Sequence, residues 1–315
     1  MTFRNIHIYI LITCLGIFAS NAQNDILEKQ VLFTNGSIEL PGTLVYHDQP
    51  SQPLIVFVHG SGNIDRNGNQ QGIKSNANYI KQLSDSLTQR GLAFFRYDKR
   101  TSNVKNIAKI MNELSFKAFS EDVKIVVDSL KKDKRFSSIH LVGHSQGSLV
   151  AMMAIDEDID SYISIAGVAS SIDKTIVEQV RKQNGDSLSN IVVSHFKELR
   201  ETDSIANVNP LLMSLFNKPT QPFLKEWMSY EPAEEIKNID IPMLIINGDK
   251  DIQVAVEDAE ALHKANPKSE LVILKNMNHV LKTIENDGDN MSSYATPDFP
   301  LSIELVEVIA DFIKK

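Results

Sequence analysis

Short apolar runs alternate with amphipathic segments along most of this chain, and this alternation constrains the fold more than any other feature. Residues 54–58 read LIVFV, a continuous apolar run that is typical of a strand covered on both faces. A segment with apolar residues at helical spacing follows at about 76–90, and Gly91 marks its end. Further strands are expected at 92–96, 139–142, 162–165, 243–247 and 271–274, and helices at about 116–130, 146–155, 256–265 and 303–313. Strands and helices in alternation predict an α/β fold with a doubly wound, mostly parallel sheet.

The N-terminal part of the chain has a different pattern, in which β-rich pieces are separated by turn dipeptides. The pieces lie at 30–33, 37–40 and 43–46, and the dipeptides between them are Asn35-Gly36 and Pro41-Gly42. Because both dipeptides are typical of turns, we expect short antiparallel strands where the chain enters the sheet.

One long stretch, from about 168 to 235, breaks the alternation. It has no clear strand, its apolar residues are spaced as in helices, and it is rich in Met and Phe. An insertion at this point would lie above the carboxyl ends of the strands, where ligands bind in open α/β sheets. We therefore expect a helical cap at 168–235, inserted between two parts of the α/β core at 23–167 and 236–315.

The first 22 residues have the pattern of a bacterial export signal. Arg4 supplies a positive charge, 8–18 form a short apolar stretch, and Ser20-Asn21-Ala22 places small residues where a signal peptidase cleaves. The apolar stretch is shorter than the roughly 20 residues that span a bilayer as a helix, which disfavours a retained membrane anchor. We expect a signal peptide at 1–22, cleavage after Ala22, and a periplasmic or extracellular protein that is not inserted in the membrane.

Cysteine content and charge exclude several classes of function. The only cysteine, Cys14, lies in the predicted signal, so the mature chain would have no disulfide, cysteine nucleophile or thiolate metal site. The formal net charge is −8, which argues against sequence-independent binding to nucleic acid. His59 and Asp65 lack a third convergent metal ligand, and the glycine-rich loop lacks the Lys-Ser/Thr ending of a phosphate-binding loop. We therefore expect no metal and no cofactor.

The pentapeptide GHSQG at 143–147 has the pattern G-x-S-x-G. It follows the predicted strand 139–142 and opens a predicted helix, and this context makes the short pattern informative. Glycines on both sides of the serine permit a sharp strand-to-helix turn that exposes its hydroxyl, and a helix N-terminus favours the developing negative charge. We interpret Ser145 as a nucleophile.

A serine hydroxyl needs a base to take its proton, and after a turn of this kind the acid and then the histidine follow along the chain. Three histidines follow Ser145, namely His195, His263 and His279. His195 lies in the predicted cap, and His263 lies on a predicted helix at a solvent-facing position. His279 lies on a loop after the strand 271–274, at the carboxyl edge of the sheet, and is the predicted general base.

The acid that orients the histidine is expected after the preceding strand, 243–247. Asp249 and Asp251 both follow that strand, on either side of residue 250. Asp249 is adjacent to Gly248 and is typical of a turn carboxylate. Asp251 has room to point back toward the site, and we predict that it holds the imidazole in the correct tautomer.

A tetrahedral oxyanion needs preorganised N–H donors. The backbone N–H of Gln146, which follows the nucleophile, is the first predicted donor. The second should come from the loop HGSG at 59–62, where glycines permit close approach of the backbone to a substrate. Ser61 is the predicted second donor, with Gly62 as the alternative.

Four charged residues flank these motifs: Asp65, Arg66, Asp98 and Arg100. An arginine here could bind an anionic substrate. We instead interpret the four as an ion-pair network that braces two loops, because such networks also concentrate charge near a site without a catalytic role.

Three motifs together resemble a known superfamily: HGSGNIDRNG at 59–68, RYDKR at 96–100 and GHSQG at 143–147. With Asp251 and His279, the set resembles the α/β-hydrolase superfamily. The first two motifs resemble the HGSGxxDRxG and RYDKRGxG motifs of bacterial serine carboxylesterases. The resemblance extends from about residue 30 to the C-terminus, except in the cap.

The resemblance implies hydrolysis of short acyl esters through an acyl-enzyme, with a small-molecule ester as substrate. Matched residue by residue, it implies that Ser145 is the nucleophile, His279 the base and Asp251 its partner. The oxyanion hole would then be formed by Ser61 and Gln146.

The sequence departs from the family pattern at 101–103, where TSN replaces the usual glycines close to the expected pocket. This difference leaves the acyl-chain preference open. Two other functions also remain open. One is a peptidase or amide hydrolase with the same triad, and the other is a catalytically inactive binding protein, which the complete residue set disfavours.

Overall fold

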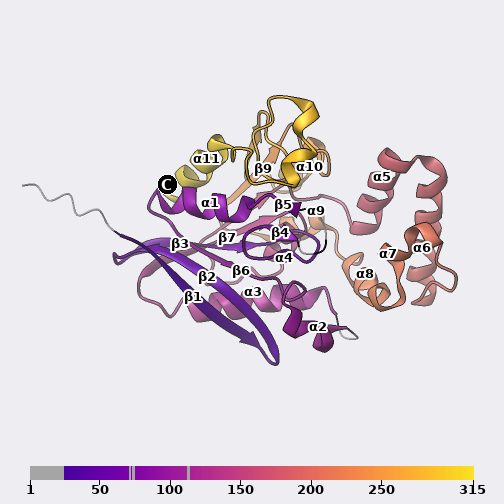
Figure 1. Cartoon of the computed structure of the whole chain (residues 1–315), viewed down its shortest axis with the longest axis horizontal. Helices are drawn as coiled ribbons and strands as arrows, with labels where there is room; N and C mark the ends of the chain where they lie inside the picture. Colours follow the sequence, from indigo (N-terminus) through magenta and orange to yellow (C-terminus); the bar gives the residue numbers. More distant parts are fainter. Residues whose placement is uncertain (1–24, 71, 73–74, 112–113) are drawn as a thin grey trace, which may run out of the picture.

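The computed structural model describes residues 25–70, 72, 75–111 and 114–315. The described residues form an eight-stranded sheet with the order β1-β2-β6-β3-β7-β8-β9-β10 (Figure 1). The strands are β1 Ile26–Asn35, β2 Ile38–His47, β3 Gln52–Val58, β6 Ala93–Tyr97, β7 Phe136–His144, β8 Ser161–Ile165, β9 Met243–Gly248 and β10 Glu270–Leu274. Pairing is antiparallel for β1–β2 and β2–β6 and parallel from β6 through β10. The predicted fold class, a mostly parallel sheet with antiparallel N-terminal strands, is confirmed.

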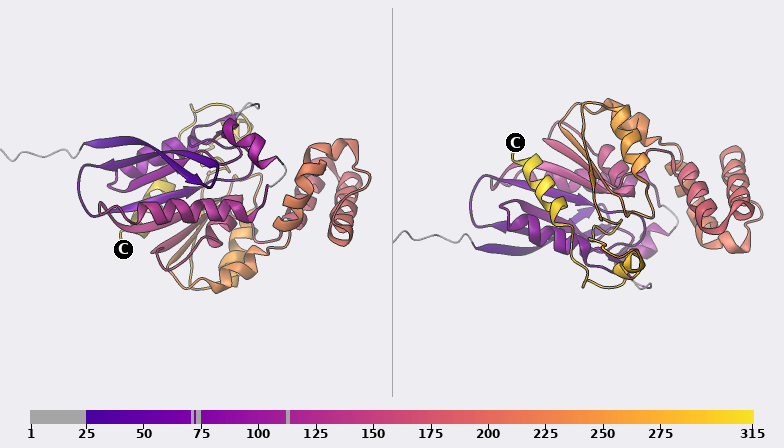
Figure 2. Two further views of the ribbon diagram at one scale, coloured as in Figure 1. Left: turned by 90° about the horizontal axis from the view of Figure 1, so that it is seen from below. Right: turned by 90° about the horizontal axis from the view of Figure 1, so that it is seen from above.

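Helices cover both faces of the sheet, and the side chains of β3 show how (Figures 1 and 2). Leu54, Val56 and Val58 belong to one buried cluster, whereas Ile55 and Phe57 belong to another, because successive side chains of a strand point to opposite faces. The first cluster includes residues of α3 (Lys117–Leu130), α4 (Gln146–Met152) and α10 (Val256–Ala265), and the second includes residues of α1 (Tyr79–Thr88) and α11 (Ile303–Ile313). The alternating pattern of the sequence therefore produces a three-layer core.

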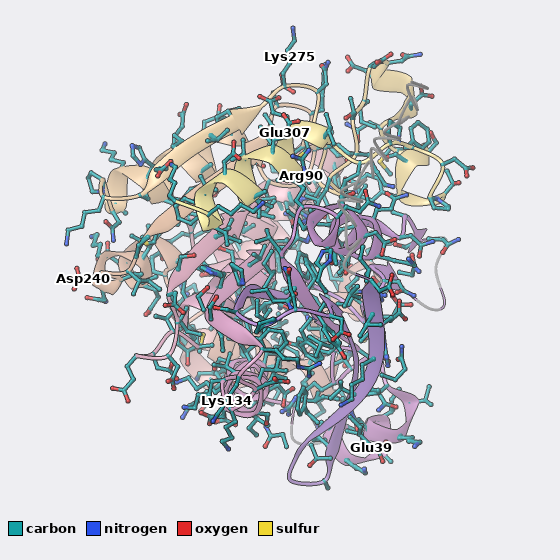
Figure 3. All side chains as sticks on the ribbon, turned by 90° about the vertical axis from the view of Figure 1, so that its left-hand side faces the viewer. Glu39, Arg90, Lys134, Asp240, Lys275 and Glu307 are labelled. Atoms are coloured by element: carbon teal, nitrogen blue, oxygen red, sulfur yellow. The ribbon has the colours of Figure 1, made fainter. Side chains whose placement is uncertain are left out.

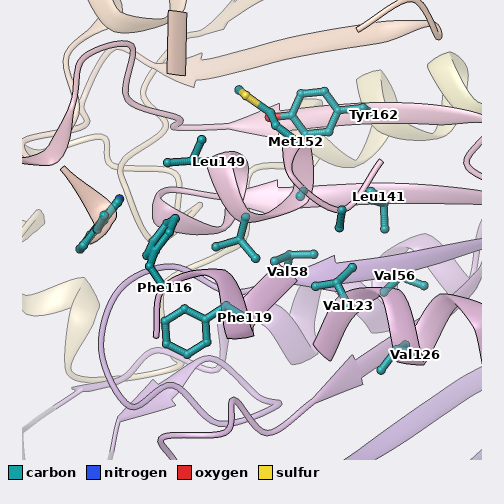
Figure 4. Packing of buried hydrophobic residues seen from close by; sticks show 14 of the residues in the cluster. Val56, Val58, Phe116, Phe119, Val123, Val126, Leu141, Leu149, Met152 and Tyr162 are labelled. Atoms are coloured by element: carbon teal, nitrogen blue, oxygen red, sulfur yellow. The ribbon is translucent and has the colours of Figure 1, made fainter. Parts of the chain in front are cut away.

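The packing of α3 and α4 on the sheet is shown in Figure 4. Val123 and Val126 of α3 lie against Val56 of β3, and all three side chains are fully buried. Full burial of one aliphatic side chain stabilises the fold by about 1.5–3 kcal/mol. Phe116 and Phe119, near the start of α3, lie toward the end of the sheet that bears the cap, so the same cluster continues into the cap.

The predicted turn at Pro41-Gly42 is wrong, because β2 continues through both residues. The carbonyl of Pro41 accepts a hydrogen bond from the N–H of Asp98 just beyond the end of β6, so the missing N–H of proline falls at the margin of that ladder. A Cβ at Gly42 would lie 2.5 Å from the Phe95 ring. The glycine is therefore there for close packing against an aromatic ring, not for a turn.

The cap lies between β8 and β9 and extends from one end of the sheet (Figures 1 and 2). Its α-helices are α5 Ile172–Asn184, α6 Asp186–Thr202, α7 Met213–Phe216, α8 Gln221–Trp227 and α9 Pro232–Glu235. Because the chain enters the cap directly after β8, the cap lies on the side of the carboxyl ends of the parallel strands. The inserted helical cap of the predicted fold class is thus present.

Two smaller elements lie between the core strands and were not predicted. Helix α2 spans Val104–Ile110, and β4 (Asn69–Gln70) pairs with β5 (Ser75–Asn76) in a separate two-stranded ribbon. Neither has the length or apolar spacing that would make it visible in the sequence.

Charged side chains surround the face shown in Figure 3, where Arg90 after α1 forms a 3.4 Å ion pair with Glu307 of α11. Among the described residues, no helix combines the length and the apolar composition required to cross a membrane. The predicted signal peptide at 1–22 lies outside the described residues.

Candidate active site

Ser145 occupies a sharp turn between β7 and α4. Its backbone has φ 54° and ψ −123°, a conformation that residues other than glycine rarely adopt. The N–H of Ser145 donates to the carbonyl of Ile165 at the end of β8, 2.9 Å away, which holds the turn against the sheet. Within 139–152, Ser145 is the one residue that is not buried. The turn therefore exposes this serine and nothing else around it.

The two glycines of the pentapeptide have no room for a side chain. A Cβ at Gly143 would lie 2.4 Å from the carbonyl oxygen of Gly147, and a Cβ at Gly147 would lie 2.2 Å from that of Val58. Both distances are below any real Cβ contact, and the obstacles are backbone atoms of the core. Only glycine allows α4 to start this close to β3 and β7.

Asp251 and His279 are in direct contact, although 28 residues separate them. Nδ1 of His279 lies 2.7 Å from Oδ2 of Asp251, and the two side chains are 7% and 1% exposed. Asp251 follows β9 and His279 follows β10, and the two strands are parallel neighbours whose carboxyl ends meet at one edge of the sheet. Because a carboxylate only accepts, Nδ1 carries the proton and Nε2 is left as a proton acceptor.

The Asp251 carboxylate has several donors. Its Oδ1 accepts from the backbone N–H groups of Gln253 and Val254, at 2.8 and 2.9 Å. Burial alone would raise the pKa of Asp251, but the charge and hydrogen bond of His279 and the two N–H donors outweigh burial, so the pKa lies below its ordinary value. Asp249, the alternative acid, instead accepts from the N–H of Asn276 and does not contact His279. The Asp251 carboxyl group is therefore ionised at neutral pH and can accept the hydrogen bond from His279.

His144, in the variable position before the serine, anchors the histidine loop. Its Nε2 donates to the backbone carbonyl of His279 at 2.8 Å, and the two ring centroids are 4.8 Å apart. On its other side, Nδ1 lies 3.4 Å from the hydroxyl of Tyr79 in α1. Burial, followed by the charge of His279, lowers the pKa of His144 to about 3, so the ring stays neutral and keeps Nδ1 as an acceptor. No sequence pattern indicates this contact, because His144 occupies a variable position (x) of the G-x-S-x-G motif.

Ser145 and His279 line the same cavity, and His144 links their two segments. The hydroxyl of Ser145 forms no hydrogen bond with another described residue.

The loop at 59–62 packs directly against the serine. A Cβ at Gly60 would lie 3.2 Å from the Cβ of Ser145, which is tighter than most real Cβ contacts and would push the serine by a few tenths of an ångström. Within the described part of the chain, the backbone N–H groups of Ser61 and Gln146 donate no hydrogen bond; Gln146 is the first residue of α4, whose initial N–H groups have no helical acceptor. The two predicted oxyanion donors are therefore both free and both adjacent to Ser145.

The cavity above these groups has a volume of about 1080 Å³. Its polar end contains Ser61, Ser145, Gln146 and His279, and its other wall comes from the cap. The apolar side chains that the cap contributes include Ile176, Leu215, Phe223, Leu224 and Trp227. A site with a few polar groups at one end and an apolar wall opposite is suited to a small, partly apolar ligand.

A family model provides the decisive comparison: the BD-FAE model matches residues 44–265, well over half of the chain. The chain belongs to the BD-FAE family. The matched region includes the serine turn and Asp251, and ends before the strand that precedes His279.

Individual proteins are also similar to this BD-FAE family member. Esterase EstD of Thermotoga maritima is 25% identical over 284 residues, which cover 81% of this chain and 60% of EstD. The chain thus spans about three fifths of the length of that curated relative.

Solved structures show the same fold. Est1E from Butyrivibrio proteoclasticus is 17% identical, covers 91% of this chain and 99% of its own, and has a TM-score of 0.56. The α/β hydrolase GrgF from Penicillium sp. sh18 is also 17% identical, with 91% and 98% coverage and a TM-score of 0.57. The resemblance to the α/β-hydrolase superfamily is therefore confirmed at the level of the fold.

The other two downstream histidines of this BD-FAE family member lie apart from Ser145. Nε2 of His195 accepts from the N–H of Asn209 within the cap, at 3.0 Å, and the ring packs against Phe216. Nδ1 of His263 on α10 lies 2.9 Å from the hydroxyl of Ser269. Both histidines have local structural partners.

The four flanking charges do not form one network, because only Arg66 and Asp98 pair with each other. Arg66 pairs with Asp98 at 2.7 Å and joins two loops, as expected, whereas the neighbouring Arg100 pairs at 2.6 Å with Asp122 on α3. Asp65 instead accepts from the N–H groups of its own loop. In the described ranges, no group of three or more His, Cys, Asp or Glu side chains could hold a metal ion.

Proposed function

We propose that this protein is a serine hydrolase that cleaves short-chain carboxylic esters through an acyl-enzyme. The observation that carries the proposal is the 2.7 Å contact between Asp251 and His279, whose ring lines the same cavity as Ser145 on its strained turn. The three residues are far apart in the sequence, and each has the chemistry that acyl transfer needs. The name of the related esterase EstD supports the same reaction class.

In the first half of the reaction, the Oγ of Ser145 attacks the ester carbonyl while Nε2 of His279 takes the hydroxyl proton. The tetrahedral intermediate collapses when the bond to the alcohol oxygen breaks, and His279 returns the proton to that oxygen. Asp251 stabilises the imidazolium that exists between these two events. Its buried and charged carboxylate is suited to this role.

In the second half, a water molecule takes the place of the alcohol. His279 removes a proton from the water, the hydroxide attacks the acyl carbonyl, and the acid leaves as the proton returns to Ser145. In both halves the carbonyl oxygen becomes negatively charged. The free N–H groups of Ser61 and Gln146 would stabilise this oxygen, and the N-terminus of α4 adds its dipole.

The cavity suggests which part of the substrate lies where. The acyl or alcohol group with the larger apolar surface would lie against the cap wall of Phe223, Leu224 and Trp227. The loop at 59–62 packs on Ser145, and we expect it to limit the space for the acyl group at the polar end. Short acyl groups are therefore the expected substrates.

An ester and an amide differ in the leaving group, and the triad alone is compatible with both. Rates on p-nitrophenyl acetate and on an aminoacyl anilide, measured in parallel on the purified protein, separate the two. We expect faster ester turnover. Faster anilide turnover would replace the ester proposal with a peptidase or amide hydrolase.

We also propose that the protein is exported, from the pattern at 1–22 alone. N-terminal sequencing of the protein recovered from a bacterial periplasm or medium should give Gln23 as the first residue. Retention of residues 1–22 on a membrane-bound chain would contradict export with cleavage.

A further inference from the structure

Lys99, the fourth residue of the RYDKR motif, is a buried lysine that lines the cavity. It follows β6, it is 5% exposed, and it lines the same cavity as Ser145. Its Nζ donates to the backbone carbonyl of Gly60 at 2.7 Å and to Oε1 of Gln146 at 2.6 Å. A single side chain therefore bonds to both segments that supply the proposed oxyanion donors.

A buried lysine is normally compensated by a carboxylate, but among the described residues Lys99 has no ion-pair partner within 4 Å. Its remaining neighbours are the ring of Phe119, whose centroid is 4.5 Å from Nζ, and the buried His59. Burial lowers the pKa of Lys99 to about 7. The Lys99 ammonium is costly to bury, and its only two hydrogen bonds among the described residues go to the neutral acceptors of Gly60 and Gln146. Its role should therefore lie in the positions of these two residues.

The bond to Gly60 determines the direction of the neighbouring N–H. The described part of the chain contains no cis peptide bond, and in a planar trans peptide the carbonyl and the following N–H point in opposite directions. When Lys99 holds the carbonyl of Gly60, the N–H of Ser61 is turned away from Lys99. This N–H is the one that has no partner and lies in the loop packed on Ser145.

The bond to Gln146 acts on the other donor segment. Its side chain reaches toward Lys99, while its backbone N–H at the start of α4 remains free. Lys99 thus ties the loop at 59–62 to the first residue of α4 across the serine. A rotation of the Gly60–Ser61 peptide would break the bond to Gly60, and a movement of the loop away from Gln146 would break one of the two bonds.

We propose that Lys99 is a positioning residue that preorganises the oxyanion hole by holding the Gly60–Ser61 peptide and Gln146 in fixed relative orientation. This inference rests on the proposed function. Since the loss of one oxyanion donor costs about 10²–10³ in kcat, we expect the loss of its orientation to cost about 10–100-fold. The effect should fall on kcat, because an oxyanion hole stabilises the charge that develops in the transition state more than it stabilises the bound ester.

The test compares Lys99→Met with the wild-type protein on p-nitrophenyl acetate. We expect kcat to fall about 10–100-fold, with KM within about threefold. The affinity for phenylboronic acid, which forms a tetrahedral anion on the serine, should fall by the same factor as kcat/KM. The affinity for the neutral alcohol product should not change.

Arg66→Met is the matched control. Arg66 joins the same two loops as Lys99 through its pair with Asp98, but it contacts neither Gly60 nor Gln146. We expect this variant to lower the melting temperature while kcat stays within about threefold of wild type. If Arg66→Met and Lys99→Met lower kcat equally, loop bracing explains the effect and the inference is wrong.

Two further outcomes are decisive. A folded Lys99→Met protein with wild-type kcat contradicts the positioning role, whereas an inactive wild-type protein contradicts the proposed function itself. If Lys99→Met does not fold, as judged by its melting transition, Lys99→Gln is measured in its place. This shorter, neutral side chain cannot make both charge-assisted bonds of the ammonium group and should show the same selective fall in kcat.

Discussion

Helices α4 and α5 show how differently the two halves of the cavity are built. All seven residues of α4 are buried, and its position behind Ser145 is fixed by backbone atoms that leave no space for a Cβ at 143 or 147. Helix α5, which forms part of the cap, has 13 residues, of which only Ile172 is buried. Ser145 therefore precedes an element that is fixed on all sides, whereas one wall of its cavity includes a helix with a single buried residue.

The difference between α4 and α5 suggests that the core supports catalysis and the cap selects the substrate. Segments with few buried apolar contacts have the lowest local opening free energies, and lids are drawn from them. Substitutions in the core turn should therefore abolish turnover or folding. Substitutions in the cap should change which substrates bind while the chemistry continues.

The largest effect is expected for Ser145→Ala. Removal of the attacking hydroxyl should lower kcat by about 10⁴-fold or more. Because alanine can occupy the same turn at no greater backbone cost than serine, the melting temperature should stay close to that of wild type. A collapsed melting transition would contradict the view that this serine is retained for function and not for the fold.

The next largest effect is expected from a comparison of two glycines, Gly147 in the core turn and Gly185 in the cap. In Gly147→Ala, a Cβ 2.2 Å from the Val58 carbonyl should destabilise the fold by about 3 kcal/mol or more and displace Ser145. Gly185, between α5 and α6, has φ 81° and open space around it, so Gly185→Ala faces only backbone strain of about 1–3 kcal/mol. Denaturant unfolding and kcat test both variants.

We expect the cap variant to keep its kcat and the core variant to lose it. Loss of kcat in folded Gly185→Ala protein would show that the cap takes part in the chemistry. That result would remove the distinction between the two regions.

The acid limb of the pH profile should depend on one histidine alone. When His279 is protonated it cannot accept the serine proton, so kcat/KM should rise with pH through a single ionisation and fall about tenfold per unit on its acid side. The pKa of both His59 and His144 is lowered to about 3, chiefly by burial, so these rings stay neutral over that range. A pH–rate profile with two ionisations on the acid limb would contradict this assignment.

The smallest effect is expected for Phe223→Ala in the cap wall. Phe223 lines the cavity and is only partly buried, so its removal should leave the fold largely intact. We expect KM for longer acyl chains to rise about tenfold or less, with kcat on the acetate ester unchanged. A chain-length series of p-nitrophenyl esters measures this effect, and a fall in kcat on the acetate would contradict it.

The sequence predicted the core better than the cap for a physical reason. Strands buried on both faces, and helices with one apolar stripe, leave periodic patterns, and α10 and α11 have the predicted bounds. The cap helices α7, α8 and α9 have only 4, 7 and 4 residues, which is too short for a periodic pattern of apolar residues. Their individual bounds could not be read from the sequence.

The site shows the same limit. Ser145, Asp251 and His279 could be selected because each follows a strand that ends at one edge of the sheet. His144 and Lys99 could not, because their roles depend on contacts with the backbone of His279 and Gly60, which no sequence spacing encodes. The Pro41-Gly42 prediction failed for a related reason, since the residue that needs the glycine, Phe95, lies far along the chain.

The proposed serine hydrolase function depends on a nucleophilic Ser145, and covalent labelling of this residue is its most direct test. The purified protein would be treated with a fluorophosphonate, and the modified peptide identified by mass spectrometry, with Ser145→Ala as the control. We predict one adduct, on Ser145, that is absent from the variant. No adduct on folded wild-type protein, or an adduct on another residue that persists in the variant, would contradict the central claim.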